Sequence, residues 1–335
     1  MRKNLLLPAL ALLVASCNLS SRGEYYSISG FTQGTTYRIT YQHPTESDLK
    51  EEIDTLLRKF DLSLSTYEPA SIISRVNANR EGVETDSMFR TVFREAARVY
   101  QLTGGAFDIS LGPVINAWGF GPGEKLEVDS AVIDSLLQFV GMDKVHLQGN
   151  RVIKSQPGLK LNVNAIAQGY AVDVVMAFLK DLGCVNCMVE IGGEIRTMGV
   201  NPKGSYWRIG VDRPDLGNMI PGQSLQVIIS MNNRSLATSG NYRKFYEKDG
   251  IRITHSIDPA TGFPKESRLL SATVLTRDCI TADAYATACM VMGLDKAWEF
   301  ILSQPDTDAY FIYGDDSGEY REWYTDELKK YLNFP

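Results

Sequence analysis

The sequence contains no block of Lys or Arg residues, and its formal net charge is -6 at pH 7. Binding to a nucleic-acid backbone needs a clustered basic face, so this composition argues against nucleic acid as the main partner. The chain also lacks the phosphate loop that ends in Gly-Lys-Ser/Thr and the GxGxxG fingerprint, which disfavours the nucleotide-binding folds built on them. No internal repeat or low-complexity tract is present. These absences leave a globular protein whose partner is a small molecule or another protein.

Cysteine is scarce, with five residues in 335. Cys184 and Cys187 have the spacing of a metal or redox pair, but no second pair or nearby His supports zinc. Cys289 lies in an apolar run, and a chain with 44% hydrophobic residues can bury one large core or two modest ones. A core of that size does not depend on disulfides, so buried thiols are expected at Cys184, Cys187, Cys279 and Cys289.

The first 16 residues have the pattern of an export signal and are excluded from the fold. Arg2 and Lys3 precede an apolar run over residues 5–14 that is too short to span a bilayer. The ending Leu-Val-Ala-Ser-Cys resembles a bacterial lipoprotein signal, which implies cleavage before Cys17 and lipidation of that residue. Residues 17–24 would then be a tether, and the mature protein would be lipid-anchored in a bacterial membrane, facing the periplasm or the exterior. The alternative is a secreted protein with an unmodified Cys17.

The apolar periodicity of the first half predicts both strands and helices. Residues 25–42 alternate like two strands joined at Thr32-Gln33-Gly34, and residues 46–60 and 86–103 have helical spacing. Residues 131–160 predict a short helix and a hairpin that turns at Gly149-Asn150. An alternating strand then leads into a long helix at Asn164-Ala165, where free N–H groups and a positive dipole suit an anion.

The second half continues the mixture of strands and helices. Strands are predicted at residues 186–199, 207–212, 224–230 and 269–276, followed by a helix over 281–293 with Thr281 as its N-cap. A further helix at 294–302 and strands at 309–314 and 319–325 complete the sheet.

Residues 236–264 concentrate polar groups of several kinds. Residues 238–242 are predicted to form one turn, and an Asp249-Gly250 hairpin with strands at 243–247 and 251–255 leads to a second turn. This second turn carries His255, Asp258 and Thr261. The combination suits a phosphate-rich ligand, although Asp-Pro and Thr-Gly are also ordinary turn formers.

Three other places are candidates for ligand contacts. Tyr67, beside a proline, is either a stacking platform or a packed turn aromatic. The glycine-rich segment around Asp108 permits close approach of a ligand or is a buried crossover. Asp283 and Thr287 are four residues apart and share a helix face, which suits Mg²⁺, although acidic residues also favour helix N-termini without a metal.

Taken in order, these segments form a pattern that resembles the ApbE family of FAD:protein FMN transferases, and the match covers essentially the whole mature chain. The motifs are Gly34-Thr35-Thr36-Tyr37, Ser65-Thr66-Tyr67, Gly105-Ala106-Phe107-Asp108, Trp118-Gly119-Phe120-Gly121, residues 165–173 (AIAQGYAVD), Gly192-Gly193-Glu194, Thr238-Ser239-Gly240, residues 255–262 (HSIDPATG), and Ala282-Asp283-Ala284 with Thr287.

The resemblance implies an ApbE-like, T-fold-related α+β architecture over residues 25–335, with two closely packed lobes and FAD in a cleft between them. It implies Mg²⁺ held by Asp283, Thr287 and the Ala165 carbonyl, with His255 as the acid/base residue. An acceptor hydroxyl would attack the FMN phosphorus of FAD, and AMP would leave. The implied FAD contacts are Tyr67, Ala106, Phe107, Asp108, Asn162, Gln168 and Ile257.

The implied chemistry agrees with the residue types, because phosphoryl-type transfer depends mainly on positioning and charge neutralisation. A His, with an unperturbed pKa near 6.5, is a natural base at neutral pH. The chain departs from the usual family pattern at five positions. The family commonly has Met at Gln33, Asp at Asn162, Gly at Asn164, an acidic residue or Lys at Gln168, and Asn at Glu190.

Two other functions use the same residues. Water could replace the acceptor hydroxyl, which would make the protein an FAD pyrophosphatase, or the protein could be a non-catalytic flavin-binding lipoprotein. The presence of Asp283, Thr287 and His255 speaks against the non-catalytic function. The resemblance suggests that the acceptors are exported flavin-carrying subunits of respiratory complexes.

The lipoprotein hypothesis predicts that Cys17→Ser gives a soluble or uncleaved protein, because the lipid is attached through the Cys17 sulfur. Membrane fractionation and the intact mass of the mature chain measure both outcomes. A processed Cys17→Ser protein that stays in the membrane fraction would contradict the hypothesis.

Overall fold

The structure is a computed structural model that describes residues 23–43, 45, 48–215, 222–241, 245–248, 251–317 and 319–334. The signal segment with Cys17 lies outside these residues, as do residues 46–47, 242–244 and 249–250, on which parts of the predicted helix and hairpin fall. Within the described ranges, no helix has the length and apolar character needed to cross a membrane.

An eight-stranded sheet forms the centre of the fold, and all of its neighbouring strands are antiparallel. In spatial order these strands are β1 (Tyr25–Thr32), β2 (Thr35–Gln42), β5 (Asn186–Ile191), β6 (Glu194–Met198), β9 (Ser235–Gly240), β12 (Leu269–Thr276), β13 (Asp308–Gly314) and β14 (Tyr320–Tyr324). The smaller sheets are β3 (Val145–Gln148) with β4 (Arg151–Lys154), β10 (Phe245–Lys248) with β11 (Ile251–Thr254), and β7 (Trp207–Asp212) with β8 (Leu225–Met231) and β15 (Leu332–Asn333).

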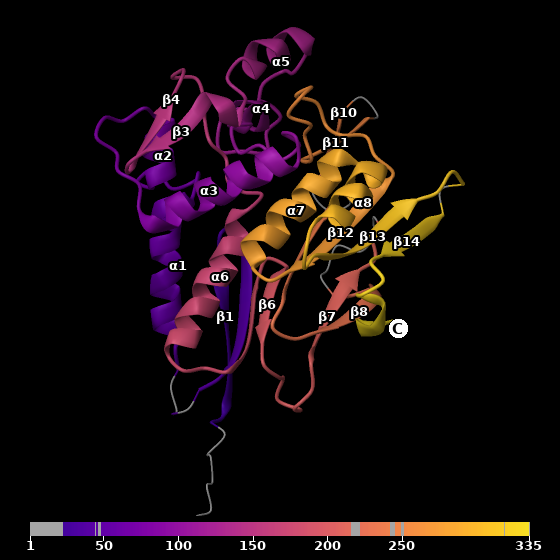
Figure 1. Cartoon of the computed structure of the whole chain (residues 1–335). Helices are drawn as coiled ribbons and strands as arrows, with labels where there is room; N and C mark the ends of the chain where they lie inside the picture. The colour runs from indigo at the N-terminus through magenta and orange to yellow at the C-terminus, as the bar shows by residue number, and fades with distance from the viewer. Residues whose placement is uncertain are drawn as a thin grey trace, which may run out of the picture.

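Helices pack against this sheet and against one another, and the mixture confirms the predicted α+β class. They are α1 (Lys50–Leu64), α2 (Ile72–Asn77), α3 (Ser87–Leu102), α4 (Gly112–Ala117), α5 (Ser130–Leu137), α6 (Ala167–Asp181), α7 (Cys279–Met292) and α8 (Leu294–Ser303), with short 3-10 turns at Met142–Lys144 and Lys329–Tyr331. Figure 1 shows α6 and α7 next to each other across the middle of the molecule, where the two helices are in contact.

The two faces of the large sheet carry different hydrophobic clusters. On β13, Ala309 and Phe311 belong to the cluster that includes α1, α3, α6 and α7, whereas Tyr310 and Ile312 belong to the cluster formed with β7 and β8. Successive strand residues point to opposite faces, so helices cover one face and the three-stranded sheet covers part of the other. The predicted division into two lobes stays a prediction.

Several local predictions are confirmed, and their causes are visible. Gln33 and Gly34 have φ angles of 50° and 74°, as the tight turn between β1 and β2 requires. The Asp86 carboxylate accepts the Phe89 N–H and caps α3, which ends where the Gly105 N–H bonds the Tyr100 carbonyl. The cysteine prediction is also confirmed, because all four described cysteines are buried and free.

Three local predictions are wrong in part. The helix predicted for residues 46–60 begins at Lys50 and continues to Leu64. Thr238, Ser239 and Gly240 belong to strand β9, where pairing with β12 overrides their turn propensity. Helix α7 begins at Cys279 with Asp278 at the N-cap, so Thr281 lies in the first turn, and its hydroxyl donates to Glu95 Oε1 at 2.7 Å.

Candidate active site

A cavity of about 730 Å³ lies where α6, α7 and the ends of several strands meet. Its wall contains all eleven described residues that the sequence singled out as site residues. They are Tyr67, Ala106, Phe107, Asp108, Asn162, Ala165, Gln168, His255, Ile257, Asp283 and Thr287. The volume is in the usual range for a small-molecule or cofactor site. The structure therefore brings these residues together, and their individual roles stay predictions.

The strand predicted before α6 is wrong, because residues 161–163 belong to no strand and residues 164–166 form a turn. Among the residues that the structure describes, the segment's one strand-like contact is a single parallel bridge between Leu111 and Lys160. Leu161 instead bonds the Asn77 side chain through both its N–H and its carbonyl, at 2.7 and 2.8 Å, and the Asn162 N–H donates to the Ile109 carbonyl at 2.7 Å. These contacts satisfy the backbone without a sheet and hold Asn162 at the cavity wall.

Asp283 and Thr287 face the cavity from α7, as their spacing predicted. The Asp283 side chain is buried, and the Gly169 N–H donates to its Oδ2 at 2.9 Å. The Thr287 hydroxyl lies 3.2 Å from the Ser239 hydroxyl of β9. This arrangement aims a carboxylate and a hydroxyl at one side of the cavity.

This donor set fits Mg²⁺. Asp283, Thr287 and the Ala165 carbonyl offer only oxygen, with a single carboxylate, and Mg²⁺ is often held by one or two carboxylates and completed by water and substrate phosphates. Among the described residues, no group of three or more His, Cys, Asp or Glu side chains is placed to hold a metal ion by itself. The chemistry of the wall therefore suits a cation that shares its shell with a ligand.

His255 lies at the end of β11, in a turn that is tied to the α4–α5 region. The Asp258 carbonyl accepts the N–H groups of Thr261 and Gly262, and the Trp118 indole donates to the Gly262 carbonyl at 2.8 Å. Gly262 has a φ of +71°, and a Cβ there would lie 2.5 Å from Ile133 Cγ2. The turn therefore requires glycine, and Trp118 fixes the backbone that carries His255.

Asp258, a second residue of this turn that could act as a base, is placed differently from His255. Its carboxylate accepts the Ala260 N–H at 2.9 Å and lies 3.4 Å from Lys265 Nζ. Among the described residues that line the cavity, His255 is present and Asp258 is absent. The geometry therefore favours His255 for proton transfer.

Asp108 is a partly buried residue of the cavity wall. Burial raises its pKa to about 6, although its Oδ1 accepts both the N–H and the hydroxyl of Ser110, at 2.7 and 2.6 Å, which lowers it. The Ser110 hydroxyl in turn accepts the Gly141 N–H at 2.6 Å. Asp108 is thus held in one orientation by a buried network.

Strand β7 supplies cavity residues that the sequence did not indicate. Ile209, Gly210, Val211 and Asp212 line the cavity, together with Gly222. Their sequence alternates like any half-buried strand, and only the packing of the three-stranded sheet brings them to the site. No local signal would have found them.

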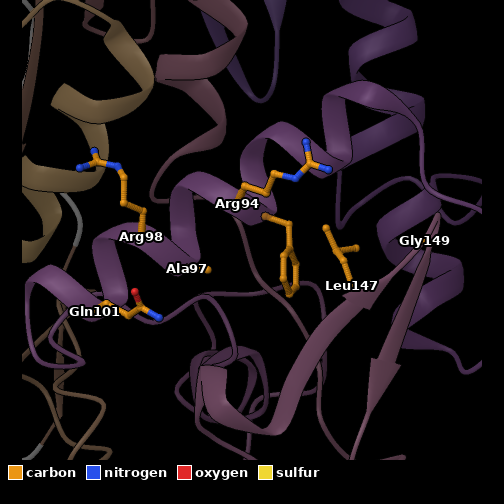
Figure 2. A pocket seen from close by; sticks show the side chains of 7 residues that line it. Arg94, Ala97, Arg98, Gln101, Leu147 and Gly149 are labelled. Atoms are coloured by element: carbon orange, nitrogen blue, oxygen red, sulfur yellow. The ribbon is translucent and has the colours of Figure 1, made fainter.

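A second hollow, of about 570 Å³, lies between α3 and the β3–β4 hairpin. Figure 2 shows that Arg94 and Arg98 on its rim point to opposite sides. Arg98 also forms an ion pair with Glu95, so the two guanidinium groups among the described residues of this hollow do not converge on one point.

Comparison with known sequences decides the family. The sequence profile of the ApbE family matches residues 33–311. The chain belongs to the ApbE family.

Individual ApbE relatives match almost the full length. The chain is 38% identical over 341 residues to the FAD:protein FMN transferase of Vibrio cholerae, covering 99% of this chain and 100% of the relative. It is 36% identical over 325 residues to the FAD:protein FMN transferase of Haemophilus influenzae, covering 92% of each.

Solved ApbE structures share the fold. The flavin transferase ApbE of Vibrio cholerae superimposes with a TM-score of 0.83 at 37% identity, over 92% of this chain and 99% of that one. The apo flavinyl transferase ApbE of Pseudomonas stutzeri gives 0.80 at 32% identity, over 92% and 97%. A variant of the Vibrio cholerae protein in which one histidine is replaced by glycine gives 0.82 at 37% identity, over 92% and 100%.

The departures from the usual ApbE pattern gather at the cavity. Asn162, Asn164, Gln168 and Glu190 all line it, whereas Gln33 is not among the described lining residues. Burial raises the pKa of the Glu190 carboxyl, which nearby Arg38 opposes. The wall therefore carries an amide at Asn162 and a carboxylate at Glu190.

The raised pKa of Asp108 predicts a pH-dependent contribution to stability. The folded state holds this proton up to about pH 6, whereas an unfolded Asp loses it near pH 4, so stability falls as pH rises from 4 to 6. Asp108→Asn keeps the acceptor for Ser110 and removes the titration. Relative to wild type, it should gain about 1–3 kcal/mol in unfolding free energy between pH 4 and pH 7.

Urea unfolding at several pH values between 4 and 7 measures this difference. Asp316→Asn is the control, because the Asp316 side chain is 95% exposed and should leave the pH profile parallel to wild type. If the unfolding free energy of Asp108→Asn also ran parallel to that of wild type from pH 4 to pH 7, burial would not raise the pKa of Asp108.

Proposed function

We propose that the protein transfers FMN from FAD to a threonine or serine hydroxyl of an acceptor flavoprotein, with Mg²⁺ as cofactor and AMP as leaving group. The coarser activity, flavin transfer from FAD to a protein, is that of its ApbE relatives, which are named FAD:protein FMN transferases. The observation that carries the proposal is the convergence of all eleven predicted and described site residues on one cavity.

FAD would lie along the cavity wall. Tyr67, whose side chain is 62% exposed at the cavity, is available to stack on a ring, and Ala106, Phe107 and Asp108 offer backbone and side-chain contacts. Asn162, Gln168 and Ile257 complete the expected contacts. The pyrophosphate would lie near the start of α6, where the helix dipole favours negative charge. The N–H groups expected to be free there mostly have partners in the protein, because those of Ile166 and Ala167 bond the Val163 carbonyl and that of Gly169 bonds Asp283.

Asp283, Thr287 and the Ala165 carbonyl would hold Mg²⁺ beside that pyrophosphate. When bound, the cation neutralises phosphate charge and so favours attack at phosphorus. Asp283 is prepared for this role because one of its oxygens is fixed by the Gly169 N–H.

His255 would accept the proton of the acceptor hydroxyl as its oxygen bonds to the FMN phosphorus. The bond from that phosphorus to the bridging oxygen then breaks, AMP leaves with the bonding electrons, and FMN remains on the acceptor as a phosphoester. Of the three histidines, His255 is the one that lines the cavity, whereas His146 is exposed on β3 and His43 bonds the Thr45 backbone.

The location and the acceptor are further parts of the proposal. Lipidation of Cys17 would hold the enzyme on the outward-facing side of a bacterial membrane, where exported flavin-carrying subunits of respiratory complexes are the acceptors. The sequence ending at Cys17 supports the anchor.

Mass spectrometry tests the transfer directly. The purified mature protein is incubated with FAD, Mg²⁺ and a candidate acceptor, and a flavin-sized mass increase on the acceptor is expected. Release of FMN and AMP with an unmodified acceptor would favour the pyrophosphatase activity instead, and no turnover of FAD would favour a flavin-binding protein.

Tyr67→Ala should weaken FAD binding by about 1–2 kcal/mol, because the aromatic contact with a ring is lost. Calorimetric titration with FAD measures the change. Tyr206→Ala is the control, because Tyr206 is 47% exposed but does not line the cavity. Unchanged affinity in Tyr67→Ala would remove Tyr67 from the site.

Asp283→Ala and His255→Ala should separate metal binding from proton transfer. Asp283 supplies the only side-chain charge for the cation, so its loss should abolish Mg²⁺-dependent turnover and weaken FAD binding. His255→Ala should keep FAD affinity within a few-fold while transfer falls by about 10²–10⁴, with partial recovery at higher pH as the hydroxyl ionises without a base.

One FAD titration and one acceptor-labelling time course per variant make the comparison. His146→Ala is the matched control, since His146 is an exposed histidine away from the cavity. Labelling at the native rate by His255→Ala would assign proton transfer to another residue.

A further inference from the structure

Where helices α6 and α7 meet, a carboxylate of each helix accepts backbone N–H groups of the other. Asp173 of α6 accepts the first two N–H groups of α7, with Cys279 N at 2.9 Å from Oδ1 and Ile280 N at 2.9 Å from Oδ2. In return, Asp283 of α7 accepts the Gly169 N–H from the first turn of α6 at 2.9 Å. Each helix thus satisfies N-terminal amides of the other. Figure 1 shows the two helices side by side.

Gly169 lets the two helices approach closely enough for this exchange. A Cβ at Gly169 would lie 2.4 Å from the Cys279 carbonyl oxygen and 2.7 Å from Asp283 Cβ. Any larger residue therefore pushes α7 away from α6 at the turn that carries Asp283.

Arg196 connects the exchange to the large sheet. From β6 it forms an ion pair with Asp173 and a second with Asp278 at 2.9 Å. Asp278 is the N-cap residue of α7, so the start of this helix is fixed to both α6 and β6. Asp173 itself is not one of the described residues that line the cavity.

We propose that Asp173 and Gly169 are positioning residues for Mg²⁺, which set the distance between Asp283 and Thr287 on α7 and the Ala165 carbonyl before α6. This inference rests on the proposed function, in which those three groups hold the cation. The Ala165 carbonyl precedes α6 and the other two donors belong to α7, so any shift of one helix against the other changes the donor spacing. Mg²⁺ demands near-ideal geometry and tolerates such a shift poorly.

A role in stability alone makes a different prediction. Removal of a buried carboxylate destabilises most folds, but it does not by itself change the affinity of a folded protein for a cation. The metal affinity of the folded protein, and not its melting temperature, therefore separates the two roles.

The test is calorimetric titration of Mg²⁺ into the FAD complex of the mature protein. Asp173→Asn should weaken Mg²⁺ binding about 10–100-fold, as for other residues that orient metal ligands, while FAD affinity without Mg²⁺ stays within a few-fold. High Mg²⁺ should then restore most of the transfer rate.

Asp308→Asn is the matched control. Asp308 is also a buried carboxylate, ion-paired with Arg234 and accepting the Thr325 hydroxyl at 2.6 Å, but it lies on β13 away from the cavity lining. It should lose stability and keep the wild-type affinity for Mg²⁺.

Gly169→Ala provides a second, independent variant in case Asp173→Asn does not fold. Its control is Gly314→Ala, because a Cβ at Gly314 meets no atom within 4 Å and Gly314 has no positive φ. Gly169→Ala should weaken Mg²⁺ binding and Gly314→Ala should not.

The outcomes distinguish this inference from the proposed function. A wild-type FAD complex that does not bind Mg²⁺ would overturn the metal assignment and this inference with it. Wild-type Mg²⁺ affinity in a folded Asp173→Asn or Gly169→Ala protein would overturn the positioning role alone and leave the proposed function intact.

Discussion

Helix α7 has almost no solvent-facing side, because eleven of its fourteen residues are buried. Its polar groups must therefore find partners inside the protein, since an unsatisfied buried amide or carboxylate costs several kcal/mol. The first two N–H groups of α7 donate to the Asp173 carboxylate, and the Asp283 carboxylate accepts the Gly169 N–H. The Thr287 hydroxyl lies within hydrogen-bond distance of a hydroxyl of β9. These contacts bind α7 to α6 and to the sheet, and they also orient the groups that face the cavity. The same requirement thus determines both the packing of the helix and the geometry of the site.

Much of the secondary structure could be predicted from the sequence because the deciding interactions are local. The β1–β2 turn and the Asp86 cap of α3 each depend on residues within a few positions of one another. The secondary-structure predictions fail where residues far away in the sequence determine the local structure. The segment before α6 alternates like a strand, but Asn77 takes the place of a neighbouring strand, and the start of α7 is set by Asp173 and not by a cap residue of its own.

The residues of the candidate site likewise fall into those that the sequence indicated and those that it did not. Residue types and spacing indicated Asp283 with Thr287 and the polar turn at His255, and the family resemblance joined them into one pattern. Neither could show that β7 would form part of the wall, because Ile209 and Val211 look like any alternating strand residues. The position of β7 depends on how its sheet packs across Leu236 and Ile312, which is a property of the whole fold.

The order of strands in the large sheet has a consequence for how the chain folds. Strand β2 pairs with β1 at once through a short turn, but its other edge is covered only by β5, more than half-way along the chain. Until then, the β1–β2 hairpin presents an open row of backbone donors and acceptors, and most of the sheet has to wait for contacts of long sequence separation. During synthesis from the N-terminus, this edge of β2 therefore stays unpaired until β5 has been made, and an unpaired edge of this kind favours association with other chains.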